Sequence, residues 1–379
     1  MTDFGSPVPG GAVAQEVDDS GSEADESGDP LLSLARVMLV EALQTHASPA
    51  EPKNVKEALA GPNSDHWHES LMEECQSILE NKTWTLVPRS SLPAGARPMG
   101  SRFIFKVKYD SQGNVNRWKS RLVVQGFTQR EGIDYDEVFA PVAHHETIRV
   151  LLSVAAAKGM HVHQMDVTTA FLIPELQEEL YMELPDGWPS ELPGDRQSQV
   201  CKLVKTLYGL KQSPRVWNAH LNDWMVSQGF TRSMSDSCLY TRPAGAGLMY
   251  VTVWVDDLLI SCKSEDDIKS FKAAISDKFK MKDLGPAHYC LGMRIRVGAG
   301  RVSMDQDRYV LDLLARFKMA ECRPVSTPLP PGTELTKAVE DDPAALAKDE
   351  ALRFREITGS LMYLVWHAPV RTWLLLSIS

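Results

Sequence analysis

The sequence lacks any long apolar run. Its longest uncharged apolar stretches, residues 151–157 and 250–255, are far shorter than the ~20 residues that a membrane span requires. The first residues also lack the basic and apolar regions of a secretory signal. We therefore expect a protein that neither crosses a membrane nor is secreted, and that folds in a reducing compartment.

The cysteines show no pairing pattern. None of the six belongs to a Cys-x-x-Cys motif, so neither a disulfide framework nor a zinc knuckle is indicated. The closely spaced histidines have no cysteine or acid that would complete a set of four zinc ligands. We expect small core residues at the cysteine positions, which are Cys75, Cys201, Cys238, Cys262, Cys290 and Cys322.

Positive charge is scarce at the N-terminus. Residues 1–51 contain ten acids and a single base, Arg36, and so carry most of the formal net charge of −10. The stretch 16–29 is too charged and too poor in apolar residues to offset the entropy of ordering. We predict an acidic, largely disordered segment over residues 1–50, followed by a folded and nearly neutral remainder.

Basic residues concentrate within residues 101–130, which contain seven bases and one acid, Asp110. Apolar residues alternate with lysines from 103 to 108, and this period of two predicts a strand. Gln112-Gly113-Asn114 marks a turn to a second strand over 117–125. We interpret the segment as a basic β-hairpin that binds anions.

The central part of the chain reads strand, helix, hairpin, helix, which indicates an α+β fold. Periodicity and capping residues define these elements, with Ser213-Pro214 as an N-cap and first turn and Ser264 as the start of a capping box. The expected elements are a helix from 64 or 65 to 79, a helix over 146–158 ended by Gly159, a strand over 161–166, a helix from 213 to Gly229, a hairpin with strands 248–255 and 258–261, and a helix from 264 to Phe279.

Three carboxylates fall at the ends of predicted apolar strands. Asp166 ends one strand, and Asp256-Asp257 form the turn of the hairpin. Taken singly, they are typical of a helix cap and a polar turn. Taken together they form an oxygen-rich site that suits Mg²⁺ or Mn²⁺ bridging substrate phosphates. Two such ions ~3.5–4 Å apart would activate a 3′-hydroxyl and stabilise a pyrophosphate leaving group.

Ordered motifs carry a family resemblance over residues 50 to 365. The motifs are WKSRLV at 118–123, GIDYDEVFAPV at 132–142, MDVTTAFL at 165–172, LYGLKQSPR at 207–215, VDD at 255–257, MKDLG at 281–285, LGMRI at 291–295 and PVSTPL at 324–329. Together they resemble the reverse transcriptases of Ty1/copia-type LTR retrotransposons. The resemblance implies a right-hand polymerase, with fingers and a palm built on a βαβ-hairpin core over 51–300, and a connection and partial thumb over 301–379.

The resemblance also implies a reaction and its partners. The implied activity is RNA-directed and DNA-directed synthesis of DNA, in which dNTPs are added to a primer 3′ end on an RNA or DNA template. Asp166 and Asp256 are the implied principal ligands of the catalytic Mg²⁺ or Mn²⁺, with Asp257 beside them. The implied location is the cytoplasm, in the virus-like particle of such an element, or the nucleus.

Further positions are implied for nucleotide binding. Lys108, Lys119 and Arg121 are candidates for triphosphate or template contacts, and a solvated strand face is the alternative. Phe171 resembles the steric gate against a ribose 2′-hydroxyl, and the alternative is a core aromatic. Lys282 is a candidate general acid toward pyrophosphate, or else a surface lysine. The remaining implied positions are Tyr208, Gly209 and Gln212 in the nucleotide pocket and a primer-gripping turn at Leu291-Gly292.

Two other functions are compatible with the same residues. One is a catalytically decayed retroelement fragment that at most binds nucleic acid. After Leu364 the sequence departs from the family pattern, which indicates a truncation or a change of reading frame and favours this alternative. The other is a metal-dependent phosphatase or nuclease, which would also use paired aspartates but leaves the basic hairpin unexplained.

Overall fold

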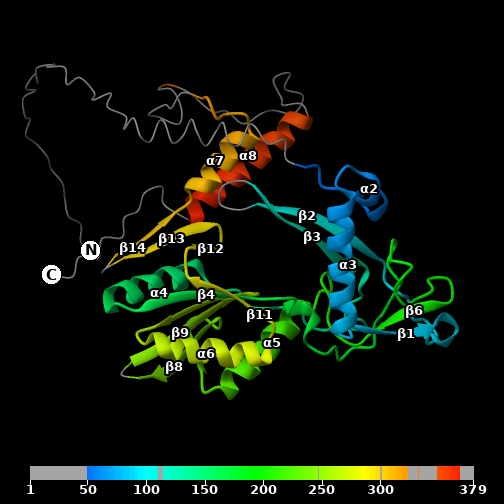
Figure 1. Ribbon diagram of the computed structural model, residues 1–379, viewed down its shortest axis with the longest axis horizontal. Coiled ribbons are helices and arrows are strands. Elements are labelled where there is room, and N and C mark those ends of the chain that lie inside the picture. The colour runs from blue at the N-terminus through cyan, green and yellow to red at the C-terminus, as the bar shows by residue number, and fades with distance from the viewer. Residues whose placement is uncertain are drawn as a thin grey trace, which may run out of the picture. The chain divides into compact units, whose positions relative to one another are not determined.

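The computed structural model describes residues 49–109, 114–245, 247–298, 301–322, 332 and 348–367, all within one unit that spans residues 47–379 (Figure 1). Four of the expected features fall wholly or largely outside these residues. They are the acidic segment 1–50, the turn residues Gln112 and Gly113, the 324–329 motif and the divergent end of the chain beyond 367.

Helices and strands are mixed along the chain, which confirms the predicted α+β class. The helices are α2 (Val55–Ala60), α3 (Ser64–Glu80), η1 (Arg89–Ser91), η2 (Gly126–Thr128), α4 (His145–Lys158), η3 (Ala170–Leu172), α5 (Ser213–Ser227), α6 (Glu265–Lys278), α7 (Asp307–Arg316) and α8 (Lys348–His367). The strands are β1 (Trp84–Pro88), β2 (Ser101–Tyr109), β3 (Val115–Val124), β4 (His161–Val167), β5 (Tyr181–Met182), β6 (Gln199–Leu203), β7 (Thr231–Arg232), β8 (Leu239–Ala244), β9 (Gly247–Trp254), β10 (Asp257–Cys262), β11 (Met281–Pro286), β12 (Tyr289–Cys290), β13 (Met293–Gly298) and β14 (Arg301–Asp305).

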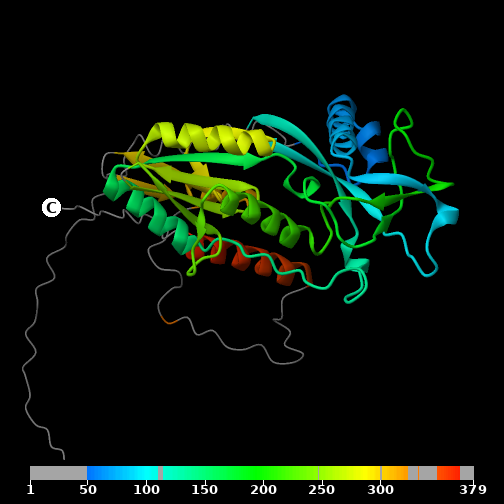
Figure 2. The ribbon, with the colours of Figure 1, turned by 90° about the horizontal axis from the view of Figure 1, so that it is seen from below.

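The largest sheet has six antiparallel strands in the order β11-β4-β10-β9-β8-β7. Successive side chains of a strand point to opposite faces, so β4 serves two cores. Met165 and Val167 pack with α5 and α6, whereas Val162 packs with α4. Figure 2 shows α6 and α4 on opposite sides of this sheet. The central strands β4 and β10 are therefore held from both faces.

The hairpin β2-β3 forms its own two-stranded sheet, and α3 packs beside it (Figure 1). Trp67 of α3 contacts Phe105 of β2 edge to face, with ring centroids 5.3 Å apart. Helix α3 also covers the open edge of β3: the Ser120 amide donates to Ser70 Oγ (2.7 Å) and the Leu122 amide donates to Glu74 Oε1 (3.0 Å). The backbone groups at this edge are thus satisfied by side chains, as buried amides require.

Most of the predicted elements are confirmed. Helix α3 begins at Ser64. Helix α4 ends at Lys158 and is followed by Gly159, which takes the left-handed conformation expected of a C-cap glycine. The Ser264 hydroxyl accepts a hydrogen bond from the Asp267 amide and caps α6. Within the described ranges, none of the helices combines the length and hydropathy that crossing a bilayer requires.

Three expectations need correction. Ser213 does not cap α5: Gln212 occupies the N-cap, and the Ser213 hydroxyl donates to the Leu207 carbonyl (2.6 Å) because its side chain is buried. The hairpin loop is Val255-Asp256, since Asp257 already pairs in β10. Of the six cysteines, five are buried as expected and Cys322 is exposed.

Candidate active site

Four charged residues meet at one end of the central strands. In the β4-β10 register Asp166 lies opposite Asp257, and in the β4-β11 register it lies opposite Lys282. The amide of Val167 donates to the carbonyl of Asp256 (2.8 Å), which ties the β9-β10 loop to the end of β4. The sheet therefore brings together aspartates that lie far apart in the sequence.

The loop that carries Asp256 is strained. It has two residues, and the first of them, Val255, has φ +57°. This left-handed region is uncommon for a β-branched residue, and such conformations cost about 1–3 kcal/mol. Strain of this kind persists only where the surrounding contacts hold it.

The carboxylates repel one another. Burial raises the pKa of Asp166, and the neighbouring Asp256 raises it further, whereas Lys119, Lys282 and Arg121 lower it. Burial also raises the pKa of Asp257 to about 6, although a hydrogen bond from Gln164 Nε2 (3.1 Å) opposes the rise. A cation at this place would reverse the effect, because it stabilises the ionised forms.

The donor set is suited to a cation that substrate helps to hold. Among the described residues no group of three or more His, Cys, Asp or Glu is arranged to hold a metal ion by itself. Mg²⁺ usually keeps several waters and is bound through one or two carboxylates together with substrate phosphates. The pair Asp166 and Asp256 fits that pattern, while the Asp257 carboxylate is engaged by Gln164.

The basic hairpin presents two opposite faces. Apolar Phe103 and Phe105 of β2 lie opposite Leu122 and Ser120 of β3 on the face toward the core. The other face is basic; it carries Arg102, Lys106, Lys108, Arg117, Lys119 and Arg121. Because strand residues alternate between faces, the packing of the apolar residues forces the basic ones together.

The two basic residues of β3 nearest the aspartates are Lys119 and Arg121. Both lower the pKa of Asp166. Burial, Arg121 and Arg117 lower the pKa of Lys119, although Asp166 opposes them. Lys108 lies nearer the hairpin tip, is exposed and stands opposite Arg117. The structure thus brings Lys119 and Arg121, rather than Lys108, to the carboxylates.

Contacts through the Tyr208 ring join Arg121 of β3 to Phe171, which follows β4. The Arg121 guanidinium lies 4.8 Å from the centroid of the Tyr208 ring, and Tyr208 contacts Phe171 edge to face with centroids 5.4 Å apart. Burial raises the pKa of Tyr208 to about 12. The Phe171 carbonyl accepts a hydrogen bond from the Thr206 hydroxyl, and its ring packs on the core of the large sheet. Gate and core roles for Phe171 therefore both stay predictions.

Gly209 lies where two backbones cross. It has φ +94°, and a Cβ there would lie 2.2 Å from the Val124 carbonyl oxygen. A Cβ on Gly126 would lie 2.0 Å from the Gly209 oxygen. The Val124 amide donates to the Tyr208 carbonyl (2.8 Å) at the same crossing. Position 209 therefore requires glycine, because a side chain there would not fit between the end of β3 and the segment around Tyr208.

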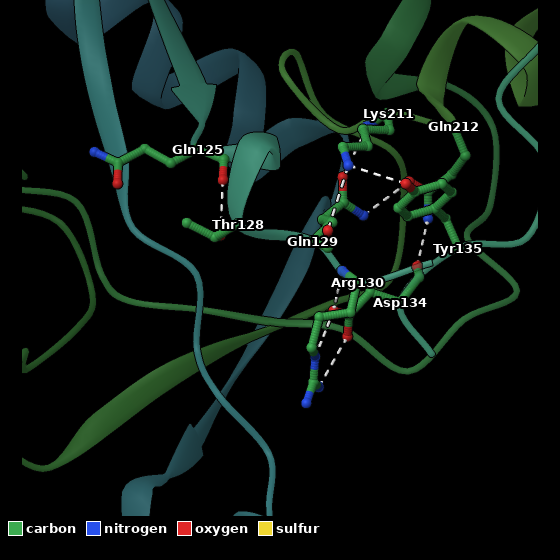
Figure 3. Close-up of polar contacts among 8 residues, drawn as sticks. All are labelled: Gln125, Thr128, Gln129, Arg130, Asp134, Tyr135, Lys211 and Gln212. Atoms are coloured by element: carbon green, nitrogen blue, oxygen red, sulfur yellow. Dashed lines mark hydrogen bonds and ion pairs between the residues drawn. The ribbon is translucent and has the colours of Figure 1, made fainter. Parts of the chain in front are cut away.

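Gln212 is fully buried within a polar network (Figure 3). Its Oε1 accepts from Gln129 Nε2 (3.0 Å), and its Nε2 donates to the Asp134 carbonyl (3.1 Å). The neighbouring Lys211 donates to Tyr135 Oη (3.0 Å) and stands 4.5 Å from the centroid of that ring. The network fastens the 132–142 motif to the start of α5, so a nucleotide contact by Gln212 stays a prediction.

Of the two remaining predicted positions, Lys282 lies beside the aspartates and the Leu291-Gly292 turn lies on a separate sheet. Lys282 is exposed on β11, opposite Asp166. Leu291 and Gly292 form the β12-β13 turn, both with positive φ (+50° and +75°), and the Tyr363 hydroxyl of α8 donates to the Leu291 carbonyl (3.0 Å).

Sequence reasoning missed several partners of these residues. Gln164 stands two residues before Asp166 on the same strand face, and that spacing could have indicated it. Gln129 and Trp217 carry no such signal, because their contacts with Gln212 and with the β9-β10 loop depend on the tertiary fold.

Comparisons with known proteins identify the family of the chain. Residues 81–331 match the family described as reverse transcriptase (RNA-dependent DNA polymerase), and the chain belongs to that family. Over 320 residues it is 40% identical to the retrovirus-related Pol polyprotein from transposon TNT 1-94 of Nicotiana tabacum, covering 83% of this chain and 23% of that protein. It is 37% identical over 331 residues to the corresponding polyprotein from transposon RE1 of Arabidopsis thaliana, covering 85% and 21%.

A yeast relative is more distant. The putative transposon Ty5-1 protein of Saccharomyces cerevisiae is 32% identical over 166 residues, covering 44% of this chain and 53% of that protein. These relatives confirm the resemblance to Ty1/copia-type elements. The chain spans less than a quarter of the length of the two plant polyproteins.

Proposed function

We propose that this chain is an RNA- and DNA-directed DNA polymerase that adds dNTPs to a primer 3′ end. The observation that carries the proposal is the arrangement of three aspartates at one end of the central strands: Asp166 lies opposite Asp257 in the β4-β10 register, and Asp256 stands in the adjoining loop. Lys119 and Arg121 lie close enough to lower the pKa of Asp166. Adjacent acidic and basic groups of this kind serve phosphoryl transfer, in which metal ions and cationic side chains share the charge of the phosphates. The large sheet with α4, α5 and α6 then corresponds to the palm, the β2-β3 hairpin with α3 to the fingers, and α7 with α8 to part of the thumb.

In this proposal Asp166 and Asp256 hold divalent cations, Mg²⁺ or Mn²⁺. Such ions would activate the primer 3′-hydroxyl and stabilise charge on the leaving pyrophosphate. Asp257, held by Gln164, adds negative charge beside the pair. Lys282 lies opposite Asp166 and would give a proton to the pyrophosphate as it leaves.

The other side chains would bind the nucleotide. Lys119 and Arg121 would contact the triphosphate, and the planar guanidinium of Arg121 can offer two parallel hydrogen bonds to a phosphate. Tyr208 contacts both the Arg121 guanidinium and the Phe171 ring. The Phe171 ring would then exclude a ribose 2′-hydroxyl.

A primer-extension assay tests the proposal. The purified 379-residue protein is mixed with a DNA primer on an RNA template, dNTPs and Mg²⁺ or Mn²⁺. We expect elongated primers, and no elongation after chelation of the metal. Template binding without extension under either metal would instead indicate a decayed fragment.

Replacing Lys119 and Arg121 together by alanine should raise the KM for dNTP at least about 10-fold, because hydrogen bonds to charged groups contribute about 1.5–3 kcal/mol each. If the two residues bind the template, the slope of binding against salt should weaken by about one unit for each phosphate that is no longer neutralised. Steady-state kinetics and a salt titration measure these effects.

The control is Lys269→Ala with Lys278→Ala, which removes the same charge from the exposed side of α6. An unchanged KM and slope would mean that the hairpin is a solvated face.

Phe171→Val should raise rNTP incorporation relative to dNTP, because it opens the space that a 2′-hydroxyl needs. We expect the ratio of kcat/KM values for dNTP and rNTP to fall about 10-fold or more, since discrimination is a difference in transition-state binding. Phe127→Val at a ring that is 79% exposed is the control. A lower melting temperature with an unchanged ratio would assign Phe171 to the core instead.

A further inference from the structure

A tryptophan of α5 touches the loop that carries Asp256. Trp217 is 1% exposed, and its indole Nε1 donates a hydrogen bond to the Val255 carbonyl (2.7 Å). The ring itself is fixed, because it packs edge to face on Phe279 with centroids 5.6 Å apart. The donor thus comes from a rigid part of the core and reaches the residue next to a proposed metal ligand.

The hydrogen bond acts on the direction of the Asp256 side chain. A peptide group is planar, so holding the Val255 carbonyl fixes the plane that ends at the Asp256 Cα. The plane on the other side of that Cα is fixed by the Val167 amide, which donates to the Asp256 carbonyl (2.8 Å). With both planes held, the direction in which the Asp256 Cβ leaves the backbone is set.

The loop needs such a restraint. Val255 has φ +57°, a conformation that β-branched residues avoid, and the loop contains no glycine that would adopt it freely. Without the indole donor the Val255 peptide would be free to rotate toward a relaxed conformation. The Asp256 carboxylate would then move relative to Asp166.

We infer that Trp217 is a positioning residue of the active site: its indole N–H holds the strained Val255 peptide so that the Asp256 carboxylate faces Asp166. The inference rests on the proposed function for its catalytic consequence. The hydrogen bond itself, and the order that it gives to the loop, do not depend on catalysis.

The test compares two tryptophans of α5. Trp217→Phe keeps an aromatic ring in the core and removes the donor. Trp224→Phe is the matched control, because Trp224 also packs on Phe279 (5.6 Å) and its indole has no protein acceptor among the described residues. The melting temperatures of the two variants show how much each substitution weakens the packing of the core.

Kinetics give the first measurement. Trp217→Phe should lower kcat for primer extension about 10- to 100-fold with the KM for dNTP changed less than about 2-fold, since small misplacements of a catalytic group cost up to about 10²-fold. Trp224→Phe should stay within about 2-fold of the unaltered protein in both. Where the unaltered protein extends the primer, an equal kcat for the two variants would overturn the inference.

Amide hydrogen exchange gives a measurement that needs no activity. In Trp217→Phe the amide of Val167 and the 250–260 segment should exchange about 10-fold faster than in Trp224→Phe. Faster exchange in Trp217→Phe alone supports the inference even if the unaltered protein extends no primer, which would defeat the proposed function only. Equal exchange in the two variants overturns the inference whatever the activity.

Discussion

Asp256→Asn is expected to abolish Mg²⁺-dependent primer extension while the fold and template binding stay nearly intact. The substitution removes a negative charge with almost no change in volume, so the two-residue loop and its hydrogen bond to β4 should persist. Loss of a metal ligand costs several kcal/mol of transition-state stabilisation, and every 1.36 kcal/mol is about tenfold in rate. We therefore expect a fall of at least about 10²-fold in kcat, measured by single-nucleotide incorporation.

The control for this prediction is Asp223→Asn. Asp223 lies on the exposed side of α5, so its loss changes the net charge equally and should leave kcat unchanged. Melting temperature and template affinity should agree among both variants and the unaltered protein. Full activity of Asp256→Asn would rule out Asp256 as a metal ligand.

Local elements of the fold were predictable because their signals are local. Helical periodicity identified α3, and the Ser264 cap identified the start of α6. Alternating apolar and basic residues identified the β2-β3 hairpin. Each of these signals comes from residues within a few positions of one another, where helix and strand periods act.

Contacts between elements were not predictable in this way. The side chains of Ser70 and Glu74 satisfy backbone amides of β3, which is distant in the sequence. Their pattern on α3 resembles that of any amphipathic helix, so the sequence contains no sign that they cover a strand edge. The same limit explains the error at Ser213, whose hydroxyl binds the Leu207 carbonyl because the preceding segment turns back on α5.

The same distinction between local signals and contacts of the fold applies to the residues of the candidate site. Its charged residues stand out in the sequence, because an aspartate or lysine beside an apolar strand is costly unless it is solvated or paired. The residues that orient them are polar or aromatic side chains in ordinary core positions, such as Gln164 and Trp217. The charged residues of the candidate site could therefore be named from the sequence, and the spacing of Gln164 from Asp166 could have added Gln164, whereas the contact of Trp217 with the β9-β10 loop appears only in the fold.

Gly209→Ala should be strongly destabilising. A Cβ there would lie 2.2 Å from the Val124 carbonyl oxygen, which is backbone and cannot move without displacing the end of β3. An alanine at φ +94° adds a conformational cost of about 1–2 kcal/mol, and overpacking adds about 1–3 kcal/mol. We expect the free energy of unfolding to fall by about 2–5 kcal/mol, measured as a lower midpoint of urea or thermal unfolding.

Gly132→Ala separates the two costs of that substitution. Gly132 also has a positive φ (+73°), yet a Cβ there would meet no atom within 4 Å, so its replacement reports the conformational cost alone. If the crossing of the two backbones is as tight as the structure has it, Gly209→Ala must unfold at a clearly lower midpoint than Gly132→Ala. Equal midpoints would mean that β3 and the Tyr208 segment can separate freely. Arg121 would then not be held over the Tyr208 ring, and the contacts of Tyr208 with Arg121 and Phe171 could not position the nucleotide as proposed.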